Sequence, residues 1–267
     1  MDKTNMEENI KRINELYHKS QGEGLTNEEK EEQAMLRKDY VSRFRYNLRA
    51  QLDHIDFVEA DETITMSKSK RHNNDDIFMN EKRNLRQTYL ACRDALTEAE
   101  LEDKNILITN RLFALAQYQE AEVILTYVSF GSEVQTIGLI QLLLFRREKQ
   151  VFVPKVVGEE IRFYKLKTIM TLAEGYKGIL EPTAAEEELT LSNIEGMKSL
   201  LIMPGTVFDE NRGRIGYGKG FYDQFLKRNP QFETVALAYE CQIAPSVPVL
   251  ENDIRPMMII TEDRVIK

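Results

Sequence analysis

The sequence has few of the residues that build metal centres and disulfide-stapled folds. Among its 267 residues there is no tryptophan, and there are only three histidines and two cysteines, Cys92 and Cys241. The cysteines are far apart in the sequence and show no metal-ligand spacing, which argues against the common zinc motifs. So few cysteines in a chain of this length favour a reducing compartment.

Long apolar segments are also lacking. Residues 1–20, MDKTNMEENIKRINELYHKS, have no apolar core of the kind found in signal peptides. The longest apolar run, IGLIQLLLF at 137–145, is too short to span a bilayer. We therefore expect a cytoplasmic protein with no membrane partner.

The charge is not dominated by one sign. The chain has 36 Lys and Arg against 44 Asp and Glu, a net charge of −8, so we expect no nucleic acid partner. Its 42% hydrophobic and 30% charged residues are ordinary for a soluble globular protein. The length allows one full α/β domain and an additional module.

The first 59 residues are expected to form a small α-helical hairpin. Apolar residues recur at helical spacing over 7–18, and Thr26 followed by Glu29 matches a capping box that would open a second helix. Apolar residues then recur every four positions on one face, at Leu36, Tyr40, Phe44, Leu48 and Leu52. A hairpin of this size is marginal alone, so we expect it to pack on the rest of the chain or to self-associate.

Residues 60–78 are polar and predict a linker. His72 in this linker, like His18 and His54 before it, has no second ligand at helical spacing, and we interpret all three as solvated residues. The stretches IKRINELYHKS, LTNEEKEEQAMLRKDYVSRFRYNLRAQL and KRHNN resemble the YnzC-like family of bacterial two-helix proteins, over about residues 6–74. That resemblance implies a module boundary and no known chemistry.

Residues 79–267 show strands alternating with helices, which predicts an α/β domain with a three-layer, mostly parallel sheet and helices on both faces. The second helix has Thr97 and Glu100 as a capping box. The expected helices are 80–96, 97–118, 134–149 and 220–228, and the expected strands are 121–129, 150–156, 160–166, 197–205, 233–240 and 256–262. Ligands of such folds bind at the carboxyl ends of the strands, where the stretch PGTVFDENRGRIGYGKG (204–220) falls.

The glycine-rich loop within GRIGYGKGFYDQFLKR (213–228) predicts a phosphate site. Alternating glycines permit positive φ, so that successive N–H groups can point into one concavity. The loop leads into a helix whose first N–H groups and dipole favour an anion, and Arg214 and Lys219 would add charge-assisted hydrogen bonds. Asp223, one turn into that helix, is a candidate Mg²⁺ ligand. The alternative is a glycine-rich turn with scattered charges.

Neither of the common glycine motifs is complete in this loop. Gly213-x-x-x-x-Gly218-Lys219 follows the nucleotide-binding P-loop pattern until Gly220 replaces its Ser or Thr. The dinucleotide fingerprint would need one more residue before its last glycine. The prediction of a phosphate site therefore depends on backbone geometry and charge.

The stretch MPGTVFDENRGRIGYGKGFYDQFLKR resembles the signature of the 5-formyltetrahydrofolate cyclo-ligase family, also called methenyltetrahydrofolate synthetases. EKRNLRQTYLACRDALTEAE, YVSFGSEVQT, GILEP and VPVLENDI resemble other stretches of that family in the same order, so the resemblance covers about residues 79–265. It implies a NagB/RpiA/CoA-transferase-like fold and an ATP- and Mg²⁺-dependent carbon–nitrogen cyclo-ligase of one-carbon metabolism. Its reaction would convert 5-formyltetrahydrofolate to 5,10-methenyltetrahydrofolate through an N5-iminium phosphate, releasing ADP and phosphate.

The resemblance also implies roles for individual residues. Arg214 and Lys219 would be catalytic, with Lys219 nearest the transferred phosphoryl group, and Asp223 and Asp253 would bind Mg²⁺. ATP would be bound by Lys82, Arg83, Arg86, Arg214, Gly216, Tyr217, Gly218, Lys219, Gly220, Phe221 and Tyr222. The folate would be bound by Val128, Glu133, Tyr217, Gly218, Lys219, Gly220 and Phe221.

Each of these residues has a simpler interpretation. The cations at 82, 83 and 86 would form a solvated helix face, Glu133 would cap a helix, Asp253 would be a turn residue, and the aromatics at 221 and 222 would belong to the core. Two departures from the family pattern stand out: Met257 lies where a second acid is frequent, and Gln224 lies where an arginine is frequent. A folate- or nucleotide-binding relative without turnover, and an interaction scaffold acting through the hairpin, remain alternatives.

Overall fold

The structure, a computed structural model, describes residues 73–183 and 187–267 together with Thr26, Glu29, Glu32 and Met35. The chain divides into two compact units, Met1–Lys68 and Ser69–Lys267, and each is considered by itself.

In the first unit the predicted capping box is confirmed. Thr26 N–H donates to Glu29 Oε2 at 3.0 Å, and Glu29 N–H donates to Thr26 Oγ1 at 3.2 Å. Glu29, Glu32 and Met35 are helical. The other predictions for this part of the chain, which are the helix at 7–18, the apolar stripe beyond residue 35, the linker up to residue 72 and the three histidines, lie outside the described residues.

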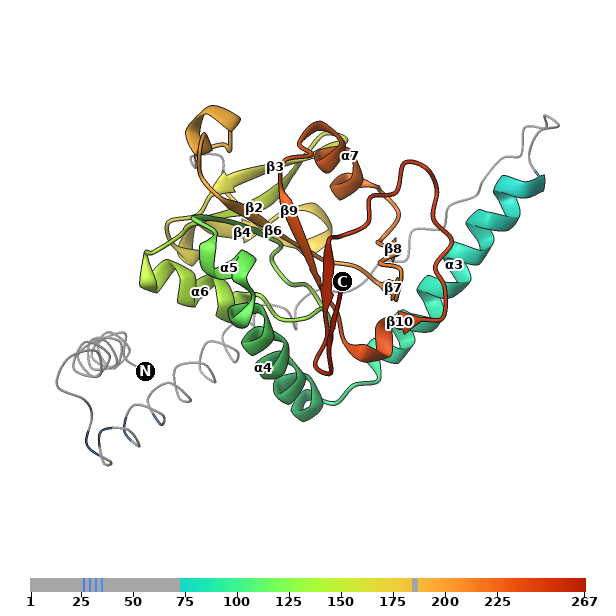
Figure 1. Ribbon diagram of the computed structural model, residues 1–267, viewed down its shortest axis with the longest axis horizontal. Coiled ribbons are helices and arrows are strands. Elements are labelled where there is room, and N and C mark those ends of the chain that lie inside the picture. Colours follow the sequence, from blue (N-terminus) through green and yellow to red (C-terminus); the bar gives the residue numbers. More distant parts are fainter. Residues whose placement is uncertain (1–25, 27–28, 30–31, 33–34, 36–72, 184–186) are drawn as a thin grey trace. The chain divides into compact units, whose positions relative to one another are not determined.

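The second unit is built on a seven-stranded sheet with the order β12-β11-β9-β6-β1-β2-β3, of which Figure 1 labels β9, β6, β2 and β3. Its strands pair in parallel except at the two edges, where β11–β12 and β2–β3 are antiparallel. This confirms the predicted mostly parallel sheet. The strands are β1 (Val123–Thr126), β2 (Gln150–Val157), β3 (Glu160–Lys165), β6 (Ser199–Met203), β9 (Glu233–Leu237), β11 (Met258–Ile260) and β12 (Val265–Ile266).

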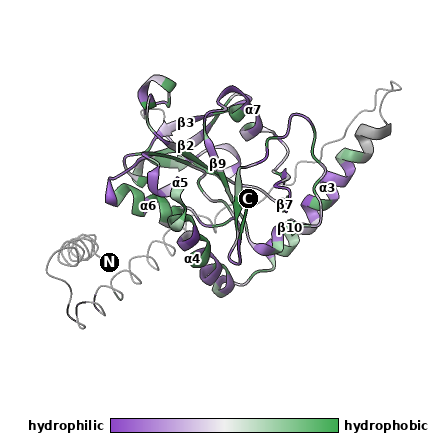
Figure 2. Cartoon of the chain, in the orientation of Figure 1, coloured by the Kyte–Doolittle hydropathy of each residue, from purple (hydrophilic) through white to green (hydrophobic). Residues whose placement is uncertain are grey.

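Alternate residues of these strands enter two separate hydrophobic cores. Ile124 and the residues of the other strands that lie on the same face of the sheet pack against the helices α4 (Glu98–Ala114), α5 (Ala116–Glu120) and α6 (Ile137–Arg146). Val123 and Leu125 face the other way, toward α7 (Phe221–Arg228) and the 3-10 turn η3 (Leu191–Ile194). The sheet is therefore the middle of three layers, and its central strands are largely hydrophobic in Figure 2 because both faces are covered.

The helix α3 (Asn73–Asp94) packs elsewhere, against a small second sheet. This sheet has the order β10-β7-β8, with β7 (Val207–Asp209), β8 (Arg214–Ile215) and β10 (Ile243–Ala244). Leu85 and Tyr89 of α3 contact its buried residues, such as Val207 and Ile215. Since β8 leads directly into the glycine loop, this packing brings α3 alongside the predicted site.

Several elements differ from the prediction. The helix α3 begins at Asn73, before the expected residue 80, and a break at Leu115 divides the helix expected at 97–118 into α4 and α5. The capping box of Thr97 and Glu100 is present. The short elements not foreseen are β7, β8, β10, β12, the hairpin of β4 (Leu172–Glu174) and β5 (Leu180–Pro182), and the 3-10 turns η1 (Ile169–Thr171), η2 (Tyr176–Gly178), η3 and η4 (Glu240–Gln242). Within the described residues, no helix combines the length and the hydrophobicity that a bilayer crossing requires.

Candidate active site

The glycine loop follows the carboxyl end of the central strand β6, as expected for a ligand site in this type of sheet. After β6 the chain forms the antiparallel pair β7 and β8, passes through residues 216–220 and enters α7. The loop therefore starts from one rigid element and ends on another.

A buried carboxylate fixes the turn that precedes the loop. Asp209 is 3% exposed, and its two oxygens accept the N–H groups of Gly213 and Val247, each at 2.7 Å. A Cβ atom at Gly213 would lie 2.8 Å from Asp209 Oδ2, so a side chain there would displace the carboxylate. The role of Asp209 is not evident from the sequence, because its partner Val247 is 38 residues away.

The loop has the backbone conformation that an anion nest needs in its second half. Gly218 has a φ of +100° and Gly220 a φ of +65°, whereas Gly216 is outside the positive region. Gly220 is also the N-cap of α7, and no side chain caps this helix. The first N–H groups of α7 are therefore available to an anion, which the helix dipole favours.

Lys219 lies between these two glycines, and its side chain is exposed. Within the part of the chain that the structure describes, it has no hydrogen bond or ion pair. An exposed ammonium group beside uncapped N–H groups would bind a phosphate without first giving up another partner.

Arg214 points from β8 toward α7. Its side chain is 5% exposed, and Nη2 forms an ion pair with Asp223 Oδ1 at 2.8 Å. The same Asp223 oxygen accepts the N–H of Ile254 at 2.9 Å, so this carboxylate also contacts the C-terminal acidic turn. Arg214 Nε is buried and has no hydrogen-bond partner in the described residues, which leaves donor capacity unused at this position.

Two cations of α3 reach the loop region. Lys82, 8% exposed, pairs with Asp253, which also accepts the N–H of Leu250 at 2.7 Å. Arg86 Nε donates to the carbonyl oxygen of Gly216 at 2.8 Å. Burial, and then the neighbouring positive charge of Arg83, lower the pKa of Arg86. An anion bound here would relieve the repulsion between the two guanidinium groups.

The predicted folate residue Glu133 lies in a buried cluster after β1. It is 6% exposed, and its Oε2 accepts the N–H of Phe130 at 2.9 Å. Burial raises the pKa of Glu133, and the hydrogen bond from Phe130, the charge of Arg93 and a hydrogen bond with Tyr217 oppose that rise. A buried carboxylate held by so few donors can accept hydrogen bonds from a ligand.

Arg93 connects this cluster to the glycine loop and was not predicted from the sequence. It is 3% exposed, at the end of α3, where Nε donates to Ser132 Oγ at 2.9 Å and Nη2 donates to the Tyr217 hydroxyl at 2.9 Å. Its proximity to Glu133 and Tyr217 depends on packing between distant segments. The only signal in the sequence was its place in the last turn of an amphipathic helix.

The remaining predicted residues line the same region from within the core. Val128 is 3% exposed. Tyr222 packs against both cores, and burial raises its pKa. Phe221 forms an edge-on contact with Tyr176, with ring centroids 6.0 Å apart. For these two aromatics the structure therefore fits core packing at least as well as ligand contact.

The two predicted metal ligands lie close together, although neither belongs to a larger acidic group. Asp223 accepts a hydrogen bond from the residue that follows Asp253. In the described residues each carboxylate keeps one oxygen without a hydrogen bond, which is Oδ2 in Asp223 and Oδ1 in Asp253. The same residues contain no cluster of three or more His, Cys, Asp or Glu side chains that could hold a metal ion. Two carboxylates with free oxygens fit Mg²⁺, whose other ligands are normally phosphates and water. Met257 is 48% exposed and would contribute no such ligand.

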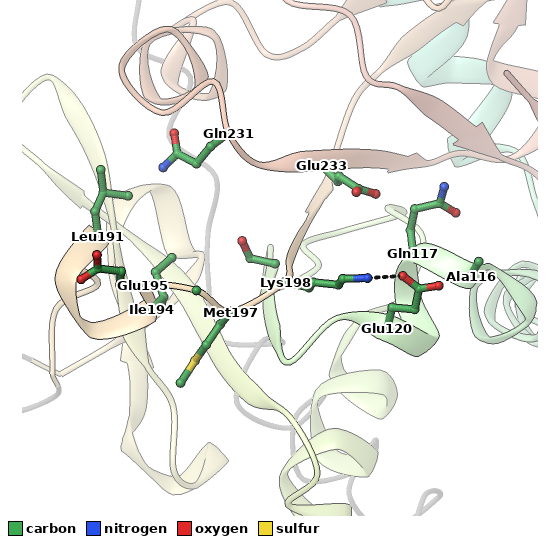
Figure 3. Close-up of a pocket in the computed structure, with 12 residues that line it drawn as sticks. Ala116, Gln117, Glu120, Leu191, Ile194, Glu195, Met197, Lys198, Gln231 and Glu233 are labelled. Atoms are coloured by element: carbon green, nitrogen blue, oxygen red, sulfur yellow. Dashed lines mark hydrogen bonds and ion pairs between the residues drawn. The ribbon is translucent and has the colours of Figure 1, made fainter.

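A pocket of about 500 Å³ lies at the opposite ends of the strands from the glycine loop, near the amino ends of β1, β6 and β9 (Figure 3). The ion pair between Lys198 and Glu120, with N and O 2.6 Å apart, crosses it. It contains none of the predicted site residues. Ligands of parallel sheets bind at the carboxyl ends of the strands, so the glycine loop, and not this pocket, lies where such a fold favours a ligand site.

These features define a class: an α/β protein with a cation-lined glycine loop that leads into an uncapped helix, beside a buried carboxylate. The profile of the 5-formyltetrahydrofolate cyclo-ligase family matches residues 78–262. The chain belongs to this family.

Individual relatives agree with this assignment. A 5-formyltetrahydrofolate cyclo-ligase of Mus musculus is 31% identical over 195 residues, covering 68% of this chain and 94% of the mouse protein. The NMR structure of the Aquifex aeolicus 5,10-methenyltetrahydrofolate synthetase superposes with a TM-score of 0.61 at 30% identity, covering 69% of this chain and 91% of that one. A synthetase from Mycoplasma pneumoniae, at 23% identity and a TM-score of 0.55, covers 68% of this chain and 99% of its own and supports the fold.

The N-terminal part has different relatives. Residues 8–70 match a family described as bacterial protein of unknown function (DUF896). A UPF0291 protein of Lachnospira eligens is 50% identical over 64 residues, which is 24% of this chain and 76% of that protein. The resemblance of this part to the YnzC-like family is confirmed, whereas the helical hairpin and the domain boundaries at 59 and 78 stay predictions.

Proposed function

We propose that this protein converts 5-formyltetrahydrofolate to 5,10-methenyltetrahydrofolate with Mg²⁺ and ATP, releasing ADP and phosphate. The family and the names of its relatives support the folate reaction. The observation that carries the proposal for this chain is the glycine loop, whose exposed Lys219 adjoins the uncapped start of α7 while its Tyr217 contacts the buried Glu133. One short loop would thus bring a phosphate and a folate together.

The chemistry requires activation of a poor leaving group. The formyl oxygen would attack the γ-phosphorus of ATP, ADP would leave, and an N5-iminium phosphate would form. N10 would then attack the formyl carbon and lose its proton, and the phosphate would depart as the ring closes. The protein's main tasks are to align the two substrates and to offset negative charge.

Residues of the site have distinct proposed roles in these steps. Lys219 would neutralise the transferred phosphoryl group, and Arg214 would donate to the polyphosphate from β8. The N–H groups from Gly218 to Tyr222 would hold phosphate oxygens, and Arg86 with Arg83 would extend the positive surface from α3. Lys82 pairs with Asp253 in this structure, so we propose that it exchanges this partner for a phosphate when ATP binds.

Mg²⁺ would be held by Asp223 and Asp253 through their free oxygens and would offset charge on the phosphates. Asp223 would keep its bond to Arg214, because its two oxygens allow both contacts. Glu133 would accept hydrogen bonds from the N–H groups of the pterin, near the backbone of Val128. Phe221 and Tyr217 would pack beside the bound substrates.

The test uses the purified full-length protein with 5-formyltetrahydrofolate, ATP and Mg²⁺, and follows the near-ultraviolet absorbance of the methenyl product. We expect turnover in the wild type and a loss of about 100-fold or more in Lys219→Ala, as for other removed electrostatic donors. Lys227→Ala is the matched control, because the side chain of this exposed lysine of α7 hydrogen-bonds only Asn252 among the described residues, and the variant should keep wild-type turnover.

Two results would contradict the proposal. Wild-type rates in Lys219→Ala would remove this lysine from the reaction. Binding of 5-formyltetrahydrofolate without methenyl product, with ATP and Mg²⁺ at saturation, would identify a relative that binds folate without turnover.

A further inference from the structure

Arg93 links the segment that carries Glu133 to the glycine loop, alongside the direct hydrogen bond between Glu133 and Tyr217. Its guanidinium reaches Ser132, beside Glu133, through Nε, and the Tyr217 hydroxyl through Nη2, each at 2.9 Å. The planar guanidinium fixes the angle between these two hydrogen bonds, which a flexible ammonium group would not do.

The segments that Arg93 joins are far apart in the sequence. Glu133 and Ser132 follow β1, Tyr217 precedes α7, and Arg93 is at the end of α3. Ser132 Oγ also donates to Asp94, so two neighbouring residues at the end of α3 hold this one serine. On the other side, Arg86 of the same helix donates to the Gly216 carbonyl, so α3 also holds the glycine loop at two positions.

The glycine loop can respond to a change at Tyr217. This side chain is 52% exposed, and it adjoins Gly218, which has a φ of +100°. Lys219 follows at once and has no partner in the described part of the chain. A shift of Tyr217 would therefore move Lys219 with little resistance from side-chain packing.

Resting on the function proposed above, we infer that Arg93 is a positioning residue that couples the folate site to the phosphate site. A folate bound at Glu133 reorders the Glu133–Tyr217–Arg93 cluster, and Arg93 passes this change to the loop that carries Lys219. Each substrate then binds more tightly when the other is present, and the coupling is reciprocal because it is a free energy between two sites.

The experiment measures the dissociation constant of 5-formyltetrahydrofolate with and without a saturating, non-hydrolysable ATP analogue and Mg²⁺, on the full-length protein. The ratio of the two constants is the coupling factor. We expect a factor of about 5 or more in the wild type, within the usual range for coupled sites. In Arg93→Gln we expect the factor to fall close to 1.

Tyr217→Phe provides a second variant, which retains the buried guanidinium of Arg93. It keeps the ring and removes the hydroxyl that accepts from Arg93 and hydrogen-bonds Glu133, so we expect the same loss of coupling. Arg111→Gln is the matched control. This partly buried arginine of α4 also donates to another segment, at the Asp263 carbonyl (2.9 Å), and its loss should lower the melting temperature without changing the coupling factor.

The outcomes separate the inference from the proposed function. A wild-type factor of 1, or an unchanged factor in both Arg93→Gln and Tyr217→Phe, overturns the inference. If Arg93 had a purely structural role, Arg93→Gln would lower the stability of the protein and leave its coupling factor unchanged. That result would also overturn the inference. Coupled binding without methenyl product would contradict the proposed function alone, and failure of the wild type to bind 5-formyltetrahydrofolate would contradict both.

Discussion

The Glu133 carboxyl group is 6% exposed, and its burial raises its pKa above the ordinary value of 4.5. Between about pH 4.5 and the raised native pKa, the native state therefore binds more protons than the unfolded chain. Stability falls as the pH rises through this interval, because the ionised carboxylate must be kept out of water. Above the native pKa, the full free-energy cost of burying the ionised Glu133 carboxylate is present.

We therefore predict that Glu133→Gln is more stable than the wild type at pH 7.5 and that the difference disappears at pH 4.5. Each kcal/mol gained raises the melting temperature by about 2–4 °C in a domain of this size. Thermal unfolding at the two pH values measures the effect, and folate binding should be lost in the same variant. Equal melting temperatures at pH 7.5 would show that Arg93 and Phe130 fully offset the burial.

At the scale of single residues, the sequence predicted those that belong to local motifs and missed those whose partners are distant in the sequence. The motif GRIGYGKGFYD showed Lys219 and Asp223 directly, since both lie within one loop and one helical turn. Asp209 and Arg93 could not be found in this way, because their roles depend on Val247 and Tyr217, which only the folded chain brings near. The ion pair of Lys82 with Asp253 was missed for the same reason.

At the scale of the elements, the glycine loop has a backbone conformation that residues with a side chain adopt only at a cost in free energy. Gly218 has a φ of +100°, and an added Cβ would lie 3.6 Å from Arg86 Nη2, an ordinary contact. The expected effect of a substitution is therefore backbone strain of about 1–2 kcal/mol rather than a clash. A strained loop would also misplace Lys219.

We predict that Gly218→Ala loses about 1–2 kcal/mol of stability and at least tenfold in kcat/KM, since a small misplacement is costly for aligned reactants. Gly158→Ala is the control, because Gly158 also has a positive φ (+62°) and open space around it, and it lies in the turn between β2 and β3. Denaturant unfolding and the absorbance assay compare the two. Equal kcat/KM losses in both variants would mean that the loop acts only through global stability.

Periodicity predicted the long elements, whereas the short ones depend on tertiary contacts. The strands β1, β2, β3, β6, β9 and β11 and the helices α6 and α7 have strong local patterns, and each lies within its predicted range except β2, which extends one residue further, to Val157. The small sheet of β7, β8 and β10 has strands of two or three residues, too short for a pattern to be visible. The packing of α3 on η4 could not be predicted from the sequence either. At this contact, burial and the nearby Cys92 raise the pKa of Cys241 to about 11.

In the whole molecule, the second unit has its own sheet, its two cores and every residue of the candidate site. We predict that a protein lacking residues 1–68 keeps kcat/KM within about threefold of the full chain, since all the candidate site residues named above lie in α3 or in later segments of the chain. Circular dichroism checks the fold of the truncated protein, and the absorbance assay checks its turnover. A folded truncation without activity would assign the N-terminal unit a part in catalysis.

The sequence was sufficient for the overall architecture, because alternating strands and helices allow few arrangements. It predicted a mostly parallel sheet and the site at the carboxyl ends of the strands. The antiparallel edge formed by β11 and β12 was not evident, since β12 has only two residues.

The central claim is that residues 213–223 hold the triphosphate of ATP. A crystal structure with a non-hydrolysable ATP analogue and Mg²⁺ tests it most directly. We predict the terminal phosphate beside Lys219 and the N–H groups that open α7, with the metal ion on Asp223 and Asp253. Phosphates bound elsewhere, with this loop empty, would contradict it.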